Sequence, residues 1–288
     1  MSSSPLVSII IPCYNAERFV ESAVRSVMEQ TYTNLEILCC DDCSTDGTLP
    51  ILQKLAAEDS RIKILRNEAN LGVVDTLNKL VSEAAGVYIA RMDADDISLP
   101  KRIEKQVAFL EKHNDIAICG CNVIHIDETD LCIAKTILPV TKYGVQKMKA
   151  FRTPFYHPAV IIRTSILKSN KYEKEFQYAE DYELWLRLLE NNEGVNLKCR
   201  LLLYRIHNQQ ISKNKTIAQI SLLKKIYSKY TFGIITTDFL DSYANYVAAN
   251  QKDSKTWIIL TKLILKTHIF LSPLLLLSIL HKFFKRAI

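Results

Sequence analysis

The chain has 288 residues, of which 48% are hydrophobic and 24% charged. This composition favours one large α/β core, or one core with a smaller appendage, and argues against a mainly disordered protein. The net charge of +6 is unevenly distributed. Residues 1–195 contain 22 Lys and Arg against 28 Asp and Glu, whereas residues 196–288 contain 15 against 3. The sequence therefore predicts an acidic body followed by a basic C-terminal part.

The basic part alternates with long Leu and Ile runs rather than with Gly, Arg or stacking aromatic residues, so we expect no nucleic-acid partner. At the other end, Met1–Pro5 has no basic residue and the apolar run Val7–Ile11 is too short for a signal peptide. We therefore expect the body of the protein to stay in the cytoplasm. The eight cysteines fit small buried side chains in a reducing compartment. Cys119 and Cys121 lack the usual spacing of zinc ligands.

The elements expected along the chain alternate between apolar strands and amphipathic helices. The predicted strand and helix pairs are 7–12 with 20–28, 35–40 with 49–57, 62–65 with 73–85, and 87–92 with 101–112. This alternation is typical of βαβ units and predicts a mostly parallel sheet with right-handed crossovers. Further β segments are expected over 116–138, a helix over about 181–190 and an apolar stretch at 201–206. This second half is expected to supply the site for a second substrate.

Polar residues follow three of the predicted strands. Asn15 comes after the first strand, Asp41 and Asp42 after the second, and Asp93 and Asp95 after the fourth. Ligands of such sheets bind beyond the carboxyl ends of the strands, so these residues should converge on one crevice. The neighbouring carboxylates Asp41 and Asp42 repel each other and need donors or cations nearby, such as a base, a ribose hydroxyl or a positive side chain.

The segment that follows Asp42 is also rich in polar residues. Ser44, Thr45 and Asp46 are explained more simply as turn and helix-capping residues.

Asp93 and Asp95 are two residues apart, so in an extended segment both could face one side and share a hard divalent ion. Mg²⁺ or Mn²⁺ there could bridge a diphosphate and neutralise charge on a leaving group. The alternative is an acidic helix start before Pro100, capped by Asp96 or Ser98. The sequence has neither the G-x-x-x-x-G-K-[ST] loop nor the G-x-G-x-x-G turn, so carboxylates and a metal would have to hold the diphosphate.

Several motifs in the right order resemble the family 2 glycosyltransferases of the GT-A fold, over roughly residues 5–210. They are Pro12-Cys13-Tyr14-Asn15, Asp41-Asp42-x-Ser44-Thr45-Asp46-Gly47-Thr48, Asn70-x-Gly72, Arg91-Met92-Asp93-Ala94-Asp95-Asp96, Ala179-Glu180-Asp181-Tyr182-Glu183-Leu184-Trp185 and Tyr204-Arg205-Ile206-His207. Cys13 and Cys43 stand where the family often has other small residues. The resemblance implies a GT-A catalytic domain over 1–213, with a Rossmann-like, mostly parallel sheet flanked by helices. Its nucleotide-sugar half would be about 1–115 and its acceptor half about 116–213.

The resemblance also implies a role for individual residues. Asp41 and Asp42 would lie against the base and ribose, Asp93 beside the ribose or the metal, and Asp95 on the metal, with Asp181 as general base. The implied nucleotide-sugar site comprises Pro12, Tyr14, Asn15, Asp41, Asp42, Asn70, Gly72, Arg91, Asp93, Ala94 and Arg205. The implied ligands of Mg²⁺ or Mn²⁺ are Asp95, Asp93 and His207.

Asp181 also fits the role on physical grounds, because it begins a helix and shares its face with Leu184, Trp185 and Leu188. Its carboxylate would point inward beside the positive end of the helix, or would simply cap that end. Arg205 and His207 could meet phosphate or metal, or could end a strand at the surface. His157-Pro158 fits either the acceptor side or a loop before a strand, and it is not included in the predicted site.

The resemblance implies an inverting glycosyltransferase that moves a sugar from a nucleotide diphosphate sugar, with UDP the expected nucleotide. The acceptor would be a hydroxyl of a cell-envelope glycan or a lipid-linked oligosaccharide. Two alternatives remain, a sugar-phosphate nucleotidyltransferase and a non-catalytic scaffold at the membrane. The first would need a Gly-rich, Arg-bearing loop after the first strand, where this chain has Pro12-Cys13-Tyr14-Asn15. The second is disfavoured by the intact set of Asp93, Asp95 and Asp181.

Residues 214–288 form a basic segment with the pattern of amphipathic helices. Its uninterrupted apolar run Ile269–Leu280 is shorter than the ~20 residues that span a bilayer. Lysines near one helical face and apolar residues beside them fit a helix lying on an anionic membrane, at the inner face of the cytoplasmic membrane. The alternative is a helical hairpin that packs on the body, or on a second copy of the chain in a homodimer.

Overall fold

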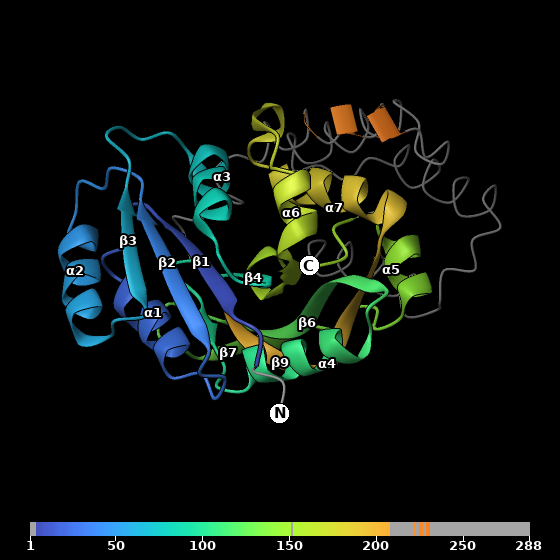
Figure 1. The fold of residues 1–288 in the computed structure, drawn as a ribbon, viewed down its shortest axis with the longest axis horizontal. Coiled ribbons are helices and arrows are strands. Elements are labelled where there is room, and N and C mark those ends of the chain that lie inside the picture. The colour runs from blue at the N-terminus through green and yellow to red at the C-terminus, as the bar shows by residue number, and fades with distance from the viewer. Residues whose placement is uncertain (1–3, 151, 208–221, 223–224, 227–228, 231–288) are drawn as a thin grey trace, which may run out of the picture. The chain divides into compact units, whose positions relative to one another are not determined.

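The computed structural model describes residues 4–150 and 152–207, together with residues 222, 225, 226, 229 and 230 (Figure 1). The chain divides into two compact units, Met1–Gln210 and Ile211–Ile288, and all the elements below belong to the first. The predicted helices, membrane contact and homodimer of residues 214–288 lie almost wholly outside the described residues. None of the described helices has the length and apolarity that a bilayer crossing requires.

The first half of the unit has the predicted alternation of strands and helices. Its elements are β1 (Val7–Cys13), α1 (Val20–Met28), β2 (Leu35–Asp41), α2 (Thr48–Glu58), β3 (Ile62–Arg66), α3 (Val73–Glu83), β4 (Tyr88–Arg91), β5 (Ile97–Ser98) and α4 (Arg102–Lys112). Strands β3, β2, β1 and β4 lie side by side in that order and are all parallel. The apolar residues of β1, β2 and β4 are buried and those of β3 are buried or half-buried. Each helix packs its apolar stripe on the sheet, so the predicted βαβ pattern is confirmed here.

The second half extends the same sheet with strands of both directions. Its elements are β6 (Ile116–Ile126), β7 (Cys132–Lys135), α5 (Lys142–Met148), the 3₁₀ turns η1 (His157–Ala159) and η2 (Lys174–Phe176), β8 (Ile161–Arg163), α6 (Thr164–Ser169), α7 (Glu180–Asn191) and β9 (Glu193–Arg205). The full strand order is β3-β2-β1-β4-β8-β6-β9-β5, with β7 on β6.

Direction within this sheet decides which residues can meet. Strand β8 is antiparallel to both β4 and β6, so β6 runs in the same direction as β4, and β9 is parallel to β6. The carboxyl ends of β1, β2, β4, β6 and β9 therefore share one edge, together with the start of β8. Parallel ladders contain most of the paired residues, which confirms the predicted α/β fold with a mostly parallel sheet.

Helices cover both faces of the sheet (Figure 1). One apolar core joins the sheet to α1, α2 and α4, and the other joins it to α3, α5, α6 and α7. The β9 strand begins well before the predicted apolar stretch at 201–206 because its first half alternates apolar residues with Asn196, Lys198 and Arg200. Because of these polar side chains, the sequence pattern does not predict the first half of the strand, which is formed through its pairing with β6.

Candidate active site

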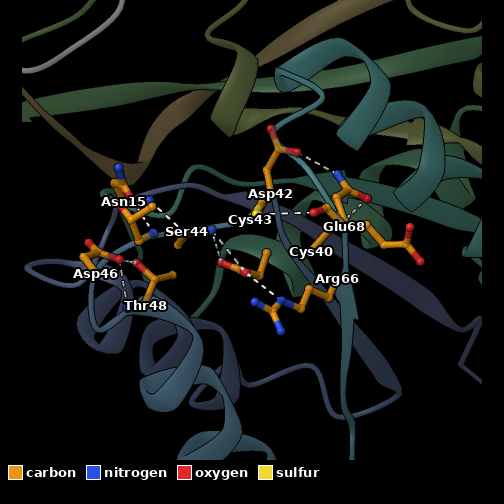
Figure 2. A network of polar contacts seen from close by, with 12 residues as sticks. Asn15, Cys40, Asp42, Cys43, Ser44, Asp46, Thr48, Arg66 and Glu68 are labelled. Carbon is orange, nitrogen blue, oxygen red and sulfur yellow. Dashed lines mark hydrogen bonds and ion pairs between the residues drawn. The ribbon is translucent and has the colours of Figure 1, made fainter.

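The loops after β1 and β2 are held together by short polar contacts (Figure 2). The Asn15 backbone N–H donates to Ser44 Oγ at 3.0 Å, and Asn15 Oδ1 accepts from the Thr45 backbone N–H at 2.9 Å. Asp46 accepts from the N–H of Thr48, the first residue of α2, at 3.0 Å. These contacts confirm the interpretation of Ser44, Thr45 and Asp46 as turn residues, and they fix Asn15 at the carboxyl edge.

The two carboxylates after β2 are both buried but differ in their partners. Asp42 accepts from Asn67 Nδ2 at 2.7 Å and from the backbone N–H groups of Leu71 and Gly72 at 2.8 and 2.9 Å. Asp41 receives only long contacts, from Ser44 N–H at 3.3 and 3.4 Å and from Arg66 Nε at 3.7 Å. The predicted need for donors is thus met by the protein at Asp42, whereas the fully buried Asp41 carboxylate has only long contacts.

Other residues of the predicted nucleotide-sugar site lie around these carboxylates. Tyr14 and Asn70 are exposed, Pro12 is half-buried at the end of β1, and Ala94 is buried. Gly72 has φ +84°, a left-handed conformation that side chains disfavour, and this conformation directs its N–H to Asp42. The Asn70 side chain accepts from the same N–H at 3.1 Å. The contact of these residues with a nucleotide stays a prediction.

Three acidic side chains meet in the turn that follows β4. Carboxylate oxygens of Asp93, Asp95 and Asp96 all lie within 4.8 Å of one another. The predicted extended segment is wrong, because Ala94 and Asp95 form a turn. The turn nevertheless brings the carboxylates together, because it folds the chain back between β4 and β5.

The acidic turn is an unfavourable arrangement without a cation. Burial raises the pKa of Asp96 well above its usual value, and the charges of Asp95 and Asp93 add to the effect. Burial also raises the pKa of Asp93, although the ion pair with Arg91 opposes the shift. Three clustered carboxylates are the hard oxygen ligands that Mg²⁺ and Mn²⁺ prefer, so the residues present fit such an ion.

Three buried arginines from three elements hold this turn. Arg91 at the end of β4 pairs with Asp93. Arg102 of α4 donates to the Arg91 carbonyl at 2.7 Å, and Arg205 of β9 donates through Nε to the Asp95 carbonyl at 2.8 Å. Arg102 was missed in the sequence, where it looks like any basic residue at a helix start. Its complete burial is the signal that only the structure provides.

The end of β9 lies against the acidic turn, which is one of the two placements that the sequence left open for Arg205 and His207. His207 Nε2 lies 2.8 Å from Asp95 Oδ2, so it is placed to share an ion with that carboxylate. The Arg205 guanidinium also binds the Asp127 carbonyl at 3.0 Å and the Asp130 carboxylate at 2.5 Å. Arg205 thus contacts protein groups in this structure, and its role as a phosphate ligand stays a prediction.

Asp181, the predicted general base, is half-buried in the first turn of α7. Burial raises the pKa of Asp181, and the charge of Arg91 opposes this shift while that of Asp93 adds to it. Asp181 and the acidic turn are therefore within electrostatic range of each other. Burial and the charge of Asp181 also raise the pKa of Glu180 to about 7.

His157, which the sequence left undecided, belongs to the same neighbourhood. Its Nε2 lies 2.8 Å from the Tyr172 hydroxyl, and both side chains are buried. Burial and then the charge of Arg91 lower the pKa of His157 well below its usual value, so the ring is neutral. His157 therefore lies within range of the arginine that pairs with Asp93.

Solved structures with the same fold define the class of the protein. S. aureus TarS 1–349 in complex with UDP-GlcNAc matches with a TM-score of 0.65 and 20% identity, covering 85% of this chain and 70% of TarS. The mannosyltransferase PcManGT from Pyrobaculum calidifontis, in complex with GDP-Man and Mn²⁺, matches with a TM-score of 0.61 and 14% identity, covering 91% of this chain and 80% of that one. The fold, with an acidic turn at its carboxyl edge, is that of the GT-A class.

The sequence places the chain within that class. Residues 8–170 match the family model "Glycosyl transferase family 2". EpsE of Bacillus subtilis (strain 168) is 41% identical over 203 residues, which are 69% of this chain and 72% of EpsE. The Escherichia coli UDP-Glc:alpha-D-GlcNAc-diphosphoundecaprenol beta-1,3-glucosyltransferase WfgD is 35% identical over 212 residues, 73% of this chain and 81% of WfgD. The chain belongs to glycosyl transferase family 2 and is a glycosyltransferase. The nucleotidyltransferase alternative finds no support in these matches.

Proposed function

We propose that the protein transfers a hexosyl group from a nucleoside diphosphate sugar to a hydroxyl of a cell-envelope glycan or of a lipid-linked sugar, with inversion at the anomeric carbon. UDP is the expected nucleotide. The names of two relatives support this donor and acceptor, since WfgD uses UDP-Glc and a diphosphoundecaprenol-linked sugar and TarS binds UDP-GlcNAc. The observation that carries the proposal is the acidic turn of this family 2 chain. It gathers carboxylate oxygens of Asp93, Asp95 and Asp96 within 4.8 Å of one another, with His207 Nε2 2.8 Å from Asp95.

In the proposed reaction the acceptor hydroxyl attacks the anomeric carbon of the donor. The bond from that carbon to the diphosphate oxygen breaks, and the nucleoside diphosphate leaves with the electron pair. Asp181 takes the proton of the hydroxyl, and burial strengthens it as a base by raising its pKa. Asp95, Asp93 and His207 would hold a bound Mg²⁺ or Mn²⁺, which supplies positive charge for the diphosphate.

The donor's nucleoside would occupy the loops after β1 and β2, where the carboxylates gather. Asp41, whose own hydrogen bonds are long, would receive hydrogen bonds from the base or ribose once its buried carboxylate turns toward the ligand. Asp42 would act mainly by holding the loop at Asn70 and Gly72 beside the base and ribose. The basic residues of 214–288 would hold the enzyme at the inner face of the cytoplasmic membrane, where a lipid-linked acceptor is accessible.

Two substitutions separate binding from chemistry. Asp181→Asn should reduce transfer by at least a hundredfold and leave Mn²⁺-dependent UDP binding within twofold, because the side chain keeps its size but cannot accept a proton. Asp95→Ala should weaken both transfer and UDP binding. Binding is measured by calorimetry, and turnover by release of UDP from UDP-glucose, UDP-GlcNAc and UDP-galactose.

The matched control is Asp115→Asn, which changes an exposed acid that pairs with Lys142 before the start of β6, at the opposite edge of the sheet. This variant should keep both turnover and UDP binding. Full turnover by Asp181→Asn would refute the assignment of the base, and a wild-type protein that releases no UDP would favour the scaffold alternative.

A further inference from the structure

A cluster of aromatic rings lies at the carboxyl edge of the acceptor half. His125 of β6 and Tyr204 of β9 face each other in the parallel ladder, with ring centroids 5.5 Å apart. Tyr156, just before η1, lies 5.3 Å from the Tyr204 ring and 5.6 Å from the His125 ring. All three side chains are half-buried, so each has a solvent-accessible part. They come from three segments that are far apart in the chain.

The position of this aromatic cluster follows from the direction of the strands. His125 and Tyr204 are near the carboxyl ends of β6 and β9, and Tyr156 precedes the antiparallel strand β8, so all three lie at the edge that also contains the acidic turn. Burial raises the pKa of Tyr204, and the nearby charges of Asp96, Asp93 and Asp95 add to this effect. The next residue, Arg205, donates its backbone N–H to Asp96 at 2.8 Å and its Nε to the Asp95 carbonyl at 2.8 Å, so the cluster is beside the acidic turn.

The Tyr204 hydroxyl differs from those of the other tyrosines near the site. The Tyr88 hydroxyl is satisfied by Glu111 and Arg163, and that of Tyr172 by His157. The Tyr156 hydroxyl likewise lies 2.9 Å from His125 Nε2, which holds these two rings in place. Among the described residues, the Tyr204 hydroxyl has no hydrogen-bond partner. A half-buried Tyr hydroxyl without a partner, beside a predicted reaction centre, is available to a ligand.

We propose that His125, Tyr156 and Tyr204 form the subsite that binds the sugar ring of the acceptor. This inference rests on the proposed function. The C–H face of a pyranose would pack on these rings, and one of its hydroxyls would bond to the Tyr204 hydroxyl. The three fixed rings favour a sugar over a flexible alkyl chain, because each ring has a flat face with a polar group at its edge.

The test measures acceptor binding separately from donor chemistry. Wild-type protein saturated with Mn²⁺ and UDP is titrated with the p-nitrophenyl α- and β-glycosides of GlcNAc, glucose and galactose, and binding is followed by saturation-transfer NMR. Tyr204→Ala and Tyr156→Ala should weaken the best glycoside at least tenfold. Tyr204→Phe, which keeps the ring and the fold, should weaken it about threefold. Mn²⁺-dependent UDP affinity and hydrolysis of the UDP-sugar without acceptor should stay within twofold for each variant.

The matched control is Tyr143→Ala, which removes a tyrosine that is 72% exposed on α5 and should leave glycoside binding unchanged. The inference is overturned if the wild-type protein binds none of the six glycosides, or if Tyr204→Phe and both alanine variants bind them as the wild type does. Failure of the proposed function gives a different result, because it would abolish UDP binding or UDP-sugar hydrolysis in the wild-type protein itself.

Discussion

Arg102 offers a sharp test of how the acidic turn is held. Its side chain is fully buried, and it donates to the Arg91 carbonyl at 2.7 Å, the Val160 carbonyl at 3.4 Å and Gln106 Oε1 at 3.2 Å. Burial lowers the pKa of Arg102 to about 10, which still leaves it charged at neutral pH. Arg102→Met keeps most of the side-chain volume and removes all of these donors and the charge.

The size of the effect follows from the acceptors that are left behind. The Arg91 carbonyl and Gln106 Oε1 lose close partners, and each unsatisfied buried acceptor costs about 1–3 kcal/mol. Removing a charge from an apolar site offsets part of this loss, so the free energy of unfolding should fall by about 2–4 kcal/mol. For a chain of this size that lowers Tm by roughly 5–15 °C. The freed carbonyl belongs to Arg91, two residues before Asp93 of the acidic turn. The Mn²⁺ concentration needed for half-saturation should therefore rise roughly tenfold.

Arg163 provides a matched control at the opposite edge of the sheet. It too bonds to backbone carbonyls, those of Ile116 and Leu110 at 2.9 Å and of His113 at 3.2 Å. Arg163→Met should lower Tm by a comparable amount and leave the Mn²⁺ dependence of UDP binding unchanged. Thermal unfolding measures Tm, and calorimetric titration measures the Mn²⁺ dependence of UDP binding, for both variants. Equal Mn²⁺ affinity in the two variants would refute the view that Arg102 positions the acidic turn.

Two further substitutions test the electrostatics of the site. The pKa of Glu180 is raised to about 7, so the folded state binds a proton on this carboxyl more tightly than the unfolded state does. The stability that results is lost as pH rises from about 4.5 to 7. Relative to Glu180→Gln, the wild-type Tm should therefore fall between pH 5 and pH 8, and a constant difference in thermal melts would contradict this. His207→Ala should raise the Mn²⁺ concentration that half-saturates UDP binding roughly tenfold or more, because it removes the partner of Asp95. An unchanged Mn²⁺ titration would show that His207 is not a metal ligand.

The repeating pattern of the first half made its fold predictable. Each strand there is a continuous apolar run followed by a helix with an apolar stripe, and each pair is local in sequence. The acceptor half was harder, because β8 is three residues long and β9 carries polar side chains where it pairs with β6. Such strands owe their conformation to distant partners, which leave little trace in the local sequence.

The sequence by itself determined the α/β class, the order of the first four strands and helices, and the family, because these depend on local periodicity and on short motifs such as the acidic segment at Asp93 and Asp95. Only the tertiary structure decided which side chains meet. It showed that the acidic segment is a turn held by Arg102 and Arg205, and that Tyr204 lies beside it. Burial and contacts across the sheet depend on strands that are far apart in the chain, so no local pattern specifies them.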